Sequence, residues 1–108
     1  MSSTFKELVS KRTKQVAEKR GILSVLQGTI KGKLKPENMP GNTIIVLDVG
    51  DNYEHRVLVS SSIAEQITEL EEIEMVQCVG MYDGSFRLVI AFDVVVLTKD
   101  KEIVFQVQ

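Results

Sequence analysis

Residues 21–35, GILSVLQGTIKGKLK, alternate between two kinds of side chain along their whole length. One set is mostly apolar or glycine and consists of Ile22, Ser24, Leu26, Gly28, Ile30, Gly32 and Leu34. The other set ends in the polar residues Gln27, Thr29, Lys31, Lys33 and Lys35. Strict alternation predicts a strand with one face toward a core and one face toward solvent. The pattern also raises the question of why the buried face carries two glycines and the solvent-facing side three lysines.

Length and composition describe an ordinary globular chain. With 108 residues, 44% hydrophobic and 26% charged, we expect a single domain with one core. No apolar run approaches the ~20 residues that a bilayer span needs, and the polar residues 1–14 lack the apolar centre of a signal peptide. We therefore expect no membrane partner and an intracellular location, cytoplasmic in a bacterium or phage and nuclear in a eukaryote.

The charges are divided unevenly along the chain. Residues 1–35 hold nine basic and two acidic residues, a net charge of +7, whereas residues 36–108 hold four basic and thirteen acidic ones, a net charge of −9. Such a division is typical of a surface that meets a polyanion, or of a basic arm that meets an acidic neighbour. A solvated basic helix without a partner is the alternative.

The N-terminal segment is predicted to be a helix. Thr4 and Glu7 fit a capping box, and Gly21 stands where a glycine ends a last turn. Arg12 interrupts an apolar stripe that consists of Phe5, Leu8, Val9, Val16 and Ala17. A helix with so narrow a stripe is marginal alone, so it must dock on the rest of the chain, on a partner or on a nucleic acid. Lys11 and Lys14 lie on the opposite side of the helix, toward solvent or phosphate.

A hairpin is predicted next, after a loop rich in proline, glycine and asparagine. Residues 43–49 and 55–60 flank the turn-rich sequence GDNYE. If the loop is residues 50–52, the inward set is Ile45, Leu47, Val49, Val57 and Val59, and the outward set is Ile44, Val46, Arg56 and Leu58. A two-residue loop reverses this assignment. Either choice leaves apolar side chains outside, for the N-terminal helix to cover or for a subunit or a base to contact.

Residues 61–72 are predicted to form a short helix, with a capping box from Ser62 to Glu65 and apolar Ile63, Ile67 and Leu70 on one face. The other face is acidic and should repel a phosphate backbone; it comprises Glu65, Glu69, Glu71, Glu72 and Glu74.

A second hairpin follows, in which Asp83-Gly84 predicts a two-residue turn that pairs Tyr82 with Ser85. This register assigns to the core face Ile73, Met75, Val79, Met81, Phe86, Leu88, Ile90, Phe92 and Val94. It assigns to the outer face Glu74, Val76, Cys78, Gly80, Tyr82, Ser85, Arg87, Val89, Ala91 and Asp93. Tyr82 and Arg87 are then near neighbours outside. Residues 102–107 form a further edge strand, in which Phe105 is expected in the core.

This order of elements resembles an OB-fold, a mainly β, five-stranded Greek-key barrel with a short helix between strands three and four. The predicted organisation is a basic N-terminal helix over residues 1–21 and the barrel over residues 22–108, together one domain. In such a barrel the long first strand coils sharply, and glycines at Gly28 and Gly32 would let it do so without a collision. The lysines would face outward beside strands two and three, where OB-folds bind oligonucleotides.

The chain looks most like small single-stranded DNA-binding proteins of phage, plasmid or mobile-element type, and it is similar in size to the smallest subunit of replication protein A and to small OB subunits of telomere-capping complexes. The first resemblance implies non-enzymatic binding of single-stranded DNA, or alternatively RNA, in replication, recombination or DNA transfer. The second implies a role as an assembly partner of another OB-fold protein. A homo-oligomer that also binds DNA would satisfy both expectations. The chain ends IVFQVQ and lacks the acidic, Phe-terminated tail of the cellular bacterial proteins.

The candidate nucleic-acid-binding residues are cations for phosphates and aromatic rings for bases. The cations are Lys31, Lys33, Lys35, Arg56 and Arg87, with Lys11 and Lys14 on the helix; the rings are Tyr82 and Tyr53. The alternative is an interaction subunit that uses its basic helix and apolar outer strand. An enzyme is the weakest candidate, because His55 is the single histidine and no phosphate-binding glycine loop is present. We predict no catalytic residue, metal or cofactor, and a structural role for Cys78.

Overall fold

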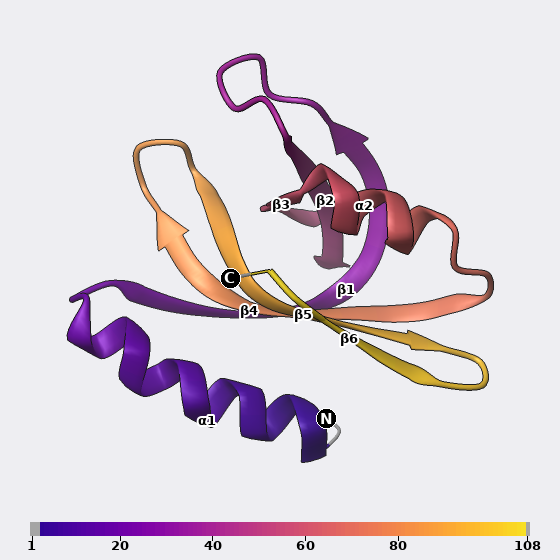
Figure 1. The fold of residues 1–108 in the computed structure, drawn as a ribbon, viewed down its shortest axis with the longest axis horizontal. Helices are drawn as coiled ribbons and strands as arrows, with labels where there is room; N and C mark the ends of the chain where they lie inside the picture. The colour runs from indigo at the N-terminus through magenta and orange to yellow at the C-terminus, as the bar shows by residue number, and fades with distance from the viewer. Residues whose placement is uncertain (1–2, 108) are drawn as a thin grey trace.

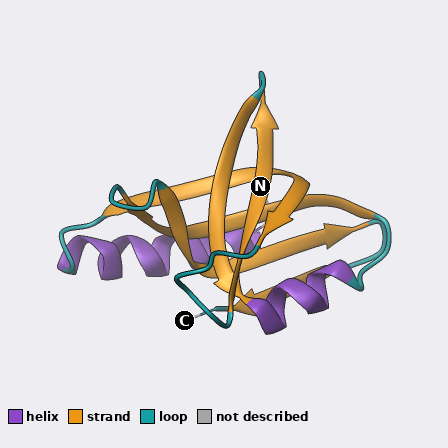
Figure 2. Cartoon of the chain, turned by 90° about the horizontal axis from the view of Figure 1, so that it is seen from above, coloured by secondary structure: helices purple, strands orange, loops and turns teal. Residues whose placement is uncertain are grey.

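We analysed a computed structural model of the chain, which describes residues 3–107. Its elements, in order, are α1 (Ser3–Glu18), β1 (Ile22–Leu34), β2 (Asn42–Gly50), β3 (Tyr53–Ser60), α2 (Ser61–Thr68), β4 (Ile73–Asp83), β5 (Leu88–Thr98) and β6 (Glu102–Gln106). This order confirms the predicted one, including the short last strand. Figure 1 shows α1 beneath the sheet and α2 beside the upper strands, and Figure 2 shows both helices flanking the strands.

The strands form a closed barrel of OB-fold type. Hydrogen-bonded neighbours follow the order β3-β2-β1-β4-β5-β6, and a parallel pairing of β3 with β5 closes the first five strands into a ring. The closure is short and joins Val57 to Val89 and Leu58 to Ile90. Five strands with this order, and a helix between β3 and β4, confirm the predicted OB-like Greek-key barrel. β6 extends the sheet beyond the ring.

β1 is the strand that bends around the barrel. Its first half, residues 22–28, pairs with β4, and its second half, residues 29–34, pairs with β2. A methyl group at Gly28 would lie 2.9 Å from the carbonyl carbon of Asp48, so this glycine is required by a close approach of two backbones. The same role predicted for Gly32 is wrong, because a methyl group there would meet nothing within 4 Å. The bend lies beside Gly32, where a bulge makes Lys31 an extra residue between Ile30 and Gly32.

Burial along β1 agrees with the predicted alternation in the middle and not at the ends. Leu26 and Ile30 pack against the barrel core. Ile22 and Leu34 were expected on the buried face, yet they are 64% and 45% exposed. Ile22 lies beyond the end of the barrel core, and the bulge at Lys31 turns Leu34 to the outer face, opposite the outward Ile44.

The β2–β3 hairpin has the inward face that the longer loop predicts. Asp51 and Asn52 form the turn with positive φ angles of 53° and 64°, and a register shift between Asp48 and Gly50 inserts one residue before the turn. Because of this extra residue, the side chains of β2 and β3 face the same way as they would with a three-residue loop. The inward residues Ile45, Leu47, Val57 and Val59 are therefore all buried in the barrel.

The register predicted for the β4–β5 hairpin is wrong. Tyr82 pairs with Val89 and Asp83 with Leu88, so residues 84–87 form a four-residue loop instead of a two-residue turn. The Asp83 carboxylate accepts a hydrogen bond from the backbone N–H of Ser85 at 2.9 Å. An aspartate that stabilises the loop through its own side chain removes the need for the tight turn that Asp-Gly otherwise favours.

The core face predicted for this hairpin is also wrong, because both faces are buried. One face lines the barrel with Val76, Cys78, Val89, Ala91, Val94 and Val96. The other packs against α1 through Val79 and Val95. A bulge between Val79 and Gly80 makes Phe92 the extra residue on β5. Of the predicted core residues, Phe86 departs most, since it lies in the loop with 53% of its surface exposed.

α1 docks on the outer face of the sheet. Of the three docking partners proposed for its narrow apolar stripe, the rest of the chain is therefore the one observed. Phe5 and Val16 are fully buried against it. Arg12 is buried too, and its guanidinium pairs with Asp93 of β5 at 2.7 and 3.1 Å and lies 5.3 Å above the Phe92 ring. The hydrogen bond from Arg12 to Asp93 raises the pKa of Arg12, outweighing the opposite effect of desolvation. Arg12 is therefore the anchor of the stripe.

The three predicted helix caps, Thr4, Gly21 and Ser62, differ in detail from the structure. Thr4 lies inside α1, so it cannot cap it, and the left-handed residue after α1 is Arg20, with φ 54°, ahead of Gly21. Gly21 instead makes room for Met81, whose Cγ would lie 2.8 Å from an added methyl group. At α2 the capping residue is Ser60, not Ser62. Within residues 3–107, neither helix has the length and apolarity to cross a membrane.

Candidate nucleic-acid interface

A shallow hollow lies across the outer face of β1, β2 and β3. It has a volume of about 290 Å³ and is lined by Lys31, Gly32, Lys33, Leu34, Val46, Glu54 and Arg56. The bulge at Lys31 and the outward parity of Arg56, opposite Val46 on β2, place these two cations on one surface. Lys33 instead pairs with the inward-facing Ile45 and its ammonium group donates to Thr68 of α2, so the expectation that it faces outward is wrong. Lys31 of β1 and Arg56 of β3, 25 residues apart in sequence, therefore face one hollow, and Lys33 lies at its border.

A second hollow, of about 260 Å³, continues from the same arginine toward the β4–β5 loop. It is lined by Glu54, His55, Arg56, Tyr82, Arg87, Leu88 and Val89. The closure of β3 on β5 brings Arg56 beside the end of the hairpin. Tyr82 and Arg87 line this hollow together, as predicted. The strand pairing from which their proximity was predicted is nevertheless wrong. Tyr82 shares the sheet face of buried Val89 and lies beyond the end of the barrel core, 39% exposed.

Lys35 extends this surface in the other direction. It lines a third hollow, of about 260 Å³, with Lys33, Thr43, Ser61, Ala64 and Glu65 near the beginning of α2. Arg56 lines the first and second hollows, which adjoin on the outer face, and Lys33 lines the first and third, with its ammonium group on the α2 side of β1. We call this surface the basic track and define it as Lys35, Lys33, Lys31, Arg56 and Arg87.

Two members of the basic track already have polar partners. Lys31 forms an exposed ion pair with Glu54, and the hydrogen bond to that carboxylate, followed by its charge, raises the pKa of Lys31. Lys33 donates to the hydroxyl of Thr68 on α2, a neutral partner. A phosphate would have to compete with a carboxylate for Lys31, whereas it would compete only with a hydroxyl for Lys33.

The exposed aromatic rings lie at two different turns. Tyr82 and Phe86 belong to the β4–β5 end, beside Arg87, and Phe86 is 53% exposed. Tyr53 is 68% exposed at the β2–β3 turn, but it lines none of the hollows of the basic track. Sequence reasoning missed Phe86 as a surface residue. The signal that could have found it is the run of polar and glycine residues from Asp83 to Ser85, which suits a longer loop as well as a tight turn.

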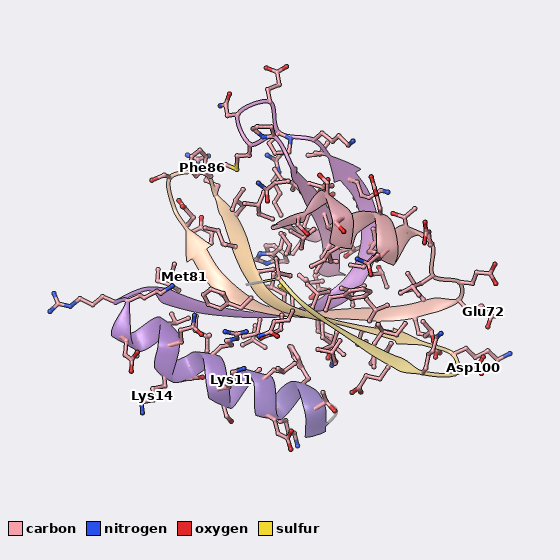
Figure 3. The ribbon with its side chains drawn as sticks, in the orientation of Figure 1. Lys11, Lys14, Glu72, Met81, Phe86 and Asp100 are labelled. Carbon is pink, nitrogen blue, oxygen red and sulfur yellow. The ribbon has the colours of Figure 1, made fainter. Side chains whose placement is uncertain are left out.

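Lys11 and Lys14 form a separate surface. Both are exposed on the side of α1 that points away from the barrel (Figure 3), and Glu7 and Glu18 lie one turn from them on the same exposed face.

The acidic end of the molecule is also remote from the hairpin loop: Figure 3 shows Glu72 and Asp100 at the opposite side from Phe86. Glu69, Glu71, Glu72 and Asp100 line one hollow there.

The two side chains considered for chemistry lie in different environments. His55 is half-buried and lines the hollow of Tyr82 and Arg87. Cys78 lies in the barrel core, where burial, with a smaller effect of the Asp93 charge, raises the pKa of its thiol to about 12. Such a thiol is protonated at neutral pH and is a poor nucleophile.

Comparisons of the chain with protein-family models, with curated proteins and with solved structures find no match.

Proposed function

We propose that this chain is a non-enzymatic OB-fold domain that binds single-stranded nucleic acid, DNA in the first place, along the basic track. The observation that carries the proposal is the sharing of Arg56 by two adjoining hollows, which makes one surface of residues from β1, β3 and the β4–β5 loop. Cations spaced along a groove that ends at exposed rings suit a strand of phosphates and unpaired bases. The biological setting that we propose is replication, recombination or DNA transfer inside the cell.

In this mechanism Arg56 and Arg87 hold successive phosphates in the hollow that they share beside the hairpin loop, and Lys33 holds a further phosphate where the strand passes toward α2. Tyr82 and Phe86 offer rings on which bases stack; each stacked base contributes ~1–3 kcal/mol, with little preference for sequence. Lys31 contributes less, because Glu54 already neutralises much of its charge. Tyr53 lies outside the track and binds only if the strand continues past the β2–β3 turn.

The test is a titration of labelled poly-dT, poly-U and duplex of equal length, followed by fluorescence anisotropy at several salt concentrations. We expect binding to the single strands, with a logarithmic salt slope that falls by about 0.7 for each phosphate contact removed. The variant is Arg56→Ala with Arg87→Ala, two cations that line the same hollow, and its control is Lys11→Ala with Lys14→Ala, which removes the same charge from α1. Equal salt slopes for the two double variants would contradict the proposal.

The second candidate is an interaction subunit of a nucleic-acid-processing complex. The exposed Leu34, 45% accessible, lies in the same hollow as Arg56 and favours it, because an apolar side chain in a charged hollow is typical of a protein contact. The titration separates the candidates, since a scaffold subunit without affinity of its own would bind none of the three nucleic acids.

A further inference from the structure

The last strand, β6, is an open edge of the sheet. It is the terminal strand in the hydrogen-bonding order and pairs only with β5 among the described residues. The N–H of Val107 donates to Phe92 of β5, and the carbonyl of Lys101 accepts from Thr98 of β5. Because alternate residues of an antiparallel strand point to one neighbour, the backbone groups of Glu102, Val104 and Gln106 point away from β5. They form an unpaired row of donors and acceptors.

This edge lacks three of the features that normally prevent another strand from pairing with it. The strand reads EIVFQ and carries no proline and no lysine, and its pairing with β5 has no bulge. Val104 is 45% exposed at the centre of the strand. It stands opposite Val95, so it lies on the face of the sheet that α1 covers further along. The edge therefore adds exposed apolar surface to its unpaired backbone groups.

The sequence of the edge complements itself when two copies run antiparallel. A two-fold axis through Val104 pairs this residue with its own copy and pairs Glu102 with Gln106 of the second molecule. The register thus brings no like charges together, and it joins two exposed valines, a pair that stabilises a sheet. On the other face the same register pairs Ile103, which is half-buried, with Phe105, which packs against the barrel core.

We propose that β6 pairs antiparallel with β6 of a second copy, centred on Val104, and so joins two barrels through one continuous sheet. The basic track runs over β1, β3 and the β4–β5 loop, away from this edge, so the dimer leaves both tracks open. The pairing depends on the β6 edge alone and holds or fails independently of nucleic-acid binding.

The first experiment measures the mass of the full chain by analytical ultracentrifugation between micromolar and millimolar concentration. We expect a dimer for the wild type and a dissociation constant about tenfold higher or more for Val104→Lys, which sets two lysines opposite each other. The matched control is Val25→Lys, which changes another exposed valine, 40% accessible, on β1. A wild type that stays monomeric throughout, or a dimer weakened equally by both substitutions, overturns the proposal.

The second experiment tests the register by oxidation. In Val104→Cys the two new thiols face each other, and the native Cys78 is buried in the core. We expect a disulfide-linked dimer on a non-reducing gel, and none for Ser10→Cys, which places a thiol on the exposed side of α1. Circular dichroism of each variant shows that the barrel is folded. Cross-linking of both variants to the same extent would show random collision and reject the proposed register.

Discussion

The ion pair that fixes α1 to the barrel gives the sharpest stability prediction. The side chains of Arg12 and Asp93 are only 5% and 2% exposed. Arg12→Met leaves the carboxylate of Asp93 buried without its cation, which costs ~3–5 kcal/mol, a large part of the stability of a small domain. A loss of that size lowers Tm by more than about 10 °C. Replacing both residues, Arg12→Met with Asp93→Leu, removes both charges and should recover most of the loss, because well-packed apolar side chains replace buried ion pairs at little cost.

Urea denaturation followed by circular dichroism measures these free energies, with Lys11→Met as the control for an exposed cation on the same helix. Hydrogen exchange at Phe5 and Val16 adds a local reading, since it distinguishes release of α1 from unfolding of the whole chain. If the double variant is destabilised by as much as the sum of the single variants, the two side chains are not coupled, and the reasoning is refuted.

Three further predictions concern the barrel and its loop. Gly28→Ala should destabilise the domain by ~1–3 kcal/mol, whereas Gly32→Ala should stabilise it by ~0.4–1 kcal/mol, as thermal melting would show; melting shifts of equal sign would contradict the structure. The thiol of Cys78 should resist a disulfide reagent at pH 8 until the protein unfolds. Because folding raises its pKa to about 12 from 9.0, its contribution to stability is present below pH 9 and falls as the pH rises further, so the unfolding free energy of wild type minus that of Cys78→Ala should decline there. Phe86→Ala should weaken poly-dT binding by ~1–3 kcal/mol and change stability by less than ~0.5 kcal/mol; unchanged anisotropy titrations would remove Phe86 from the proposed site.

The sequence predicts the order of the elements well and the facing of one hairpin badly. Alternation in β1 and the inward valines of β3 were readable because one face of each is apolar. In β4 and β5 both faces are apolar, since the barrel buries one and α1 the other, so parity carries no information there. The bulge between Val79 and Gly80 then exchanges the inner and outer faces along β5, and no local sequence pattern predicts it.

Long-range pairing explains the rest of what sequence reasoning missed. Arg12 looks like an error in an apolar stripe until Asp93, 81 residues away, is placed beneath it. The meeting of Arg56 with Tyr82 and Arg87 depends in the same way on the β3–β5 closure. Residue types alone did suggest these three side chains, because residues 36–108 hold only four basic residues and two tyrosines.

The bend of β1 has a consequence for how the chain reaches this structure. β2 with β3, and β4 with β5, are hairpins that can form from neighbouring segments, but neither closes a core without β1. The first half of β1 must find β4, about 50 residues further along the chain, while its second half finds β2. Such distant pairings are slow to form, on the scale of milliseconds to seconds for small barrels. Folding of the barrel therefore depends on the pairing of β1, and the two hairpins become one cooperative unit only when β1 has paired with both.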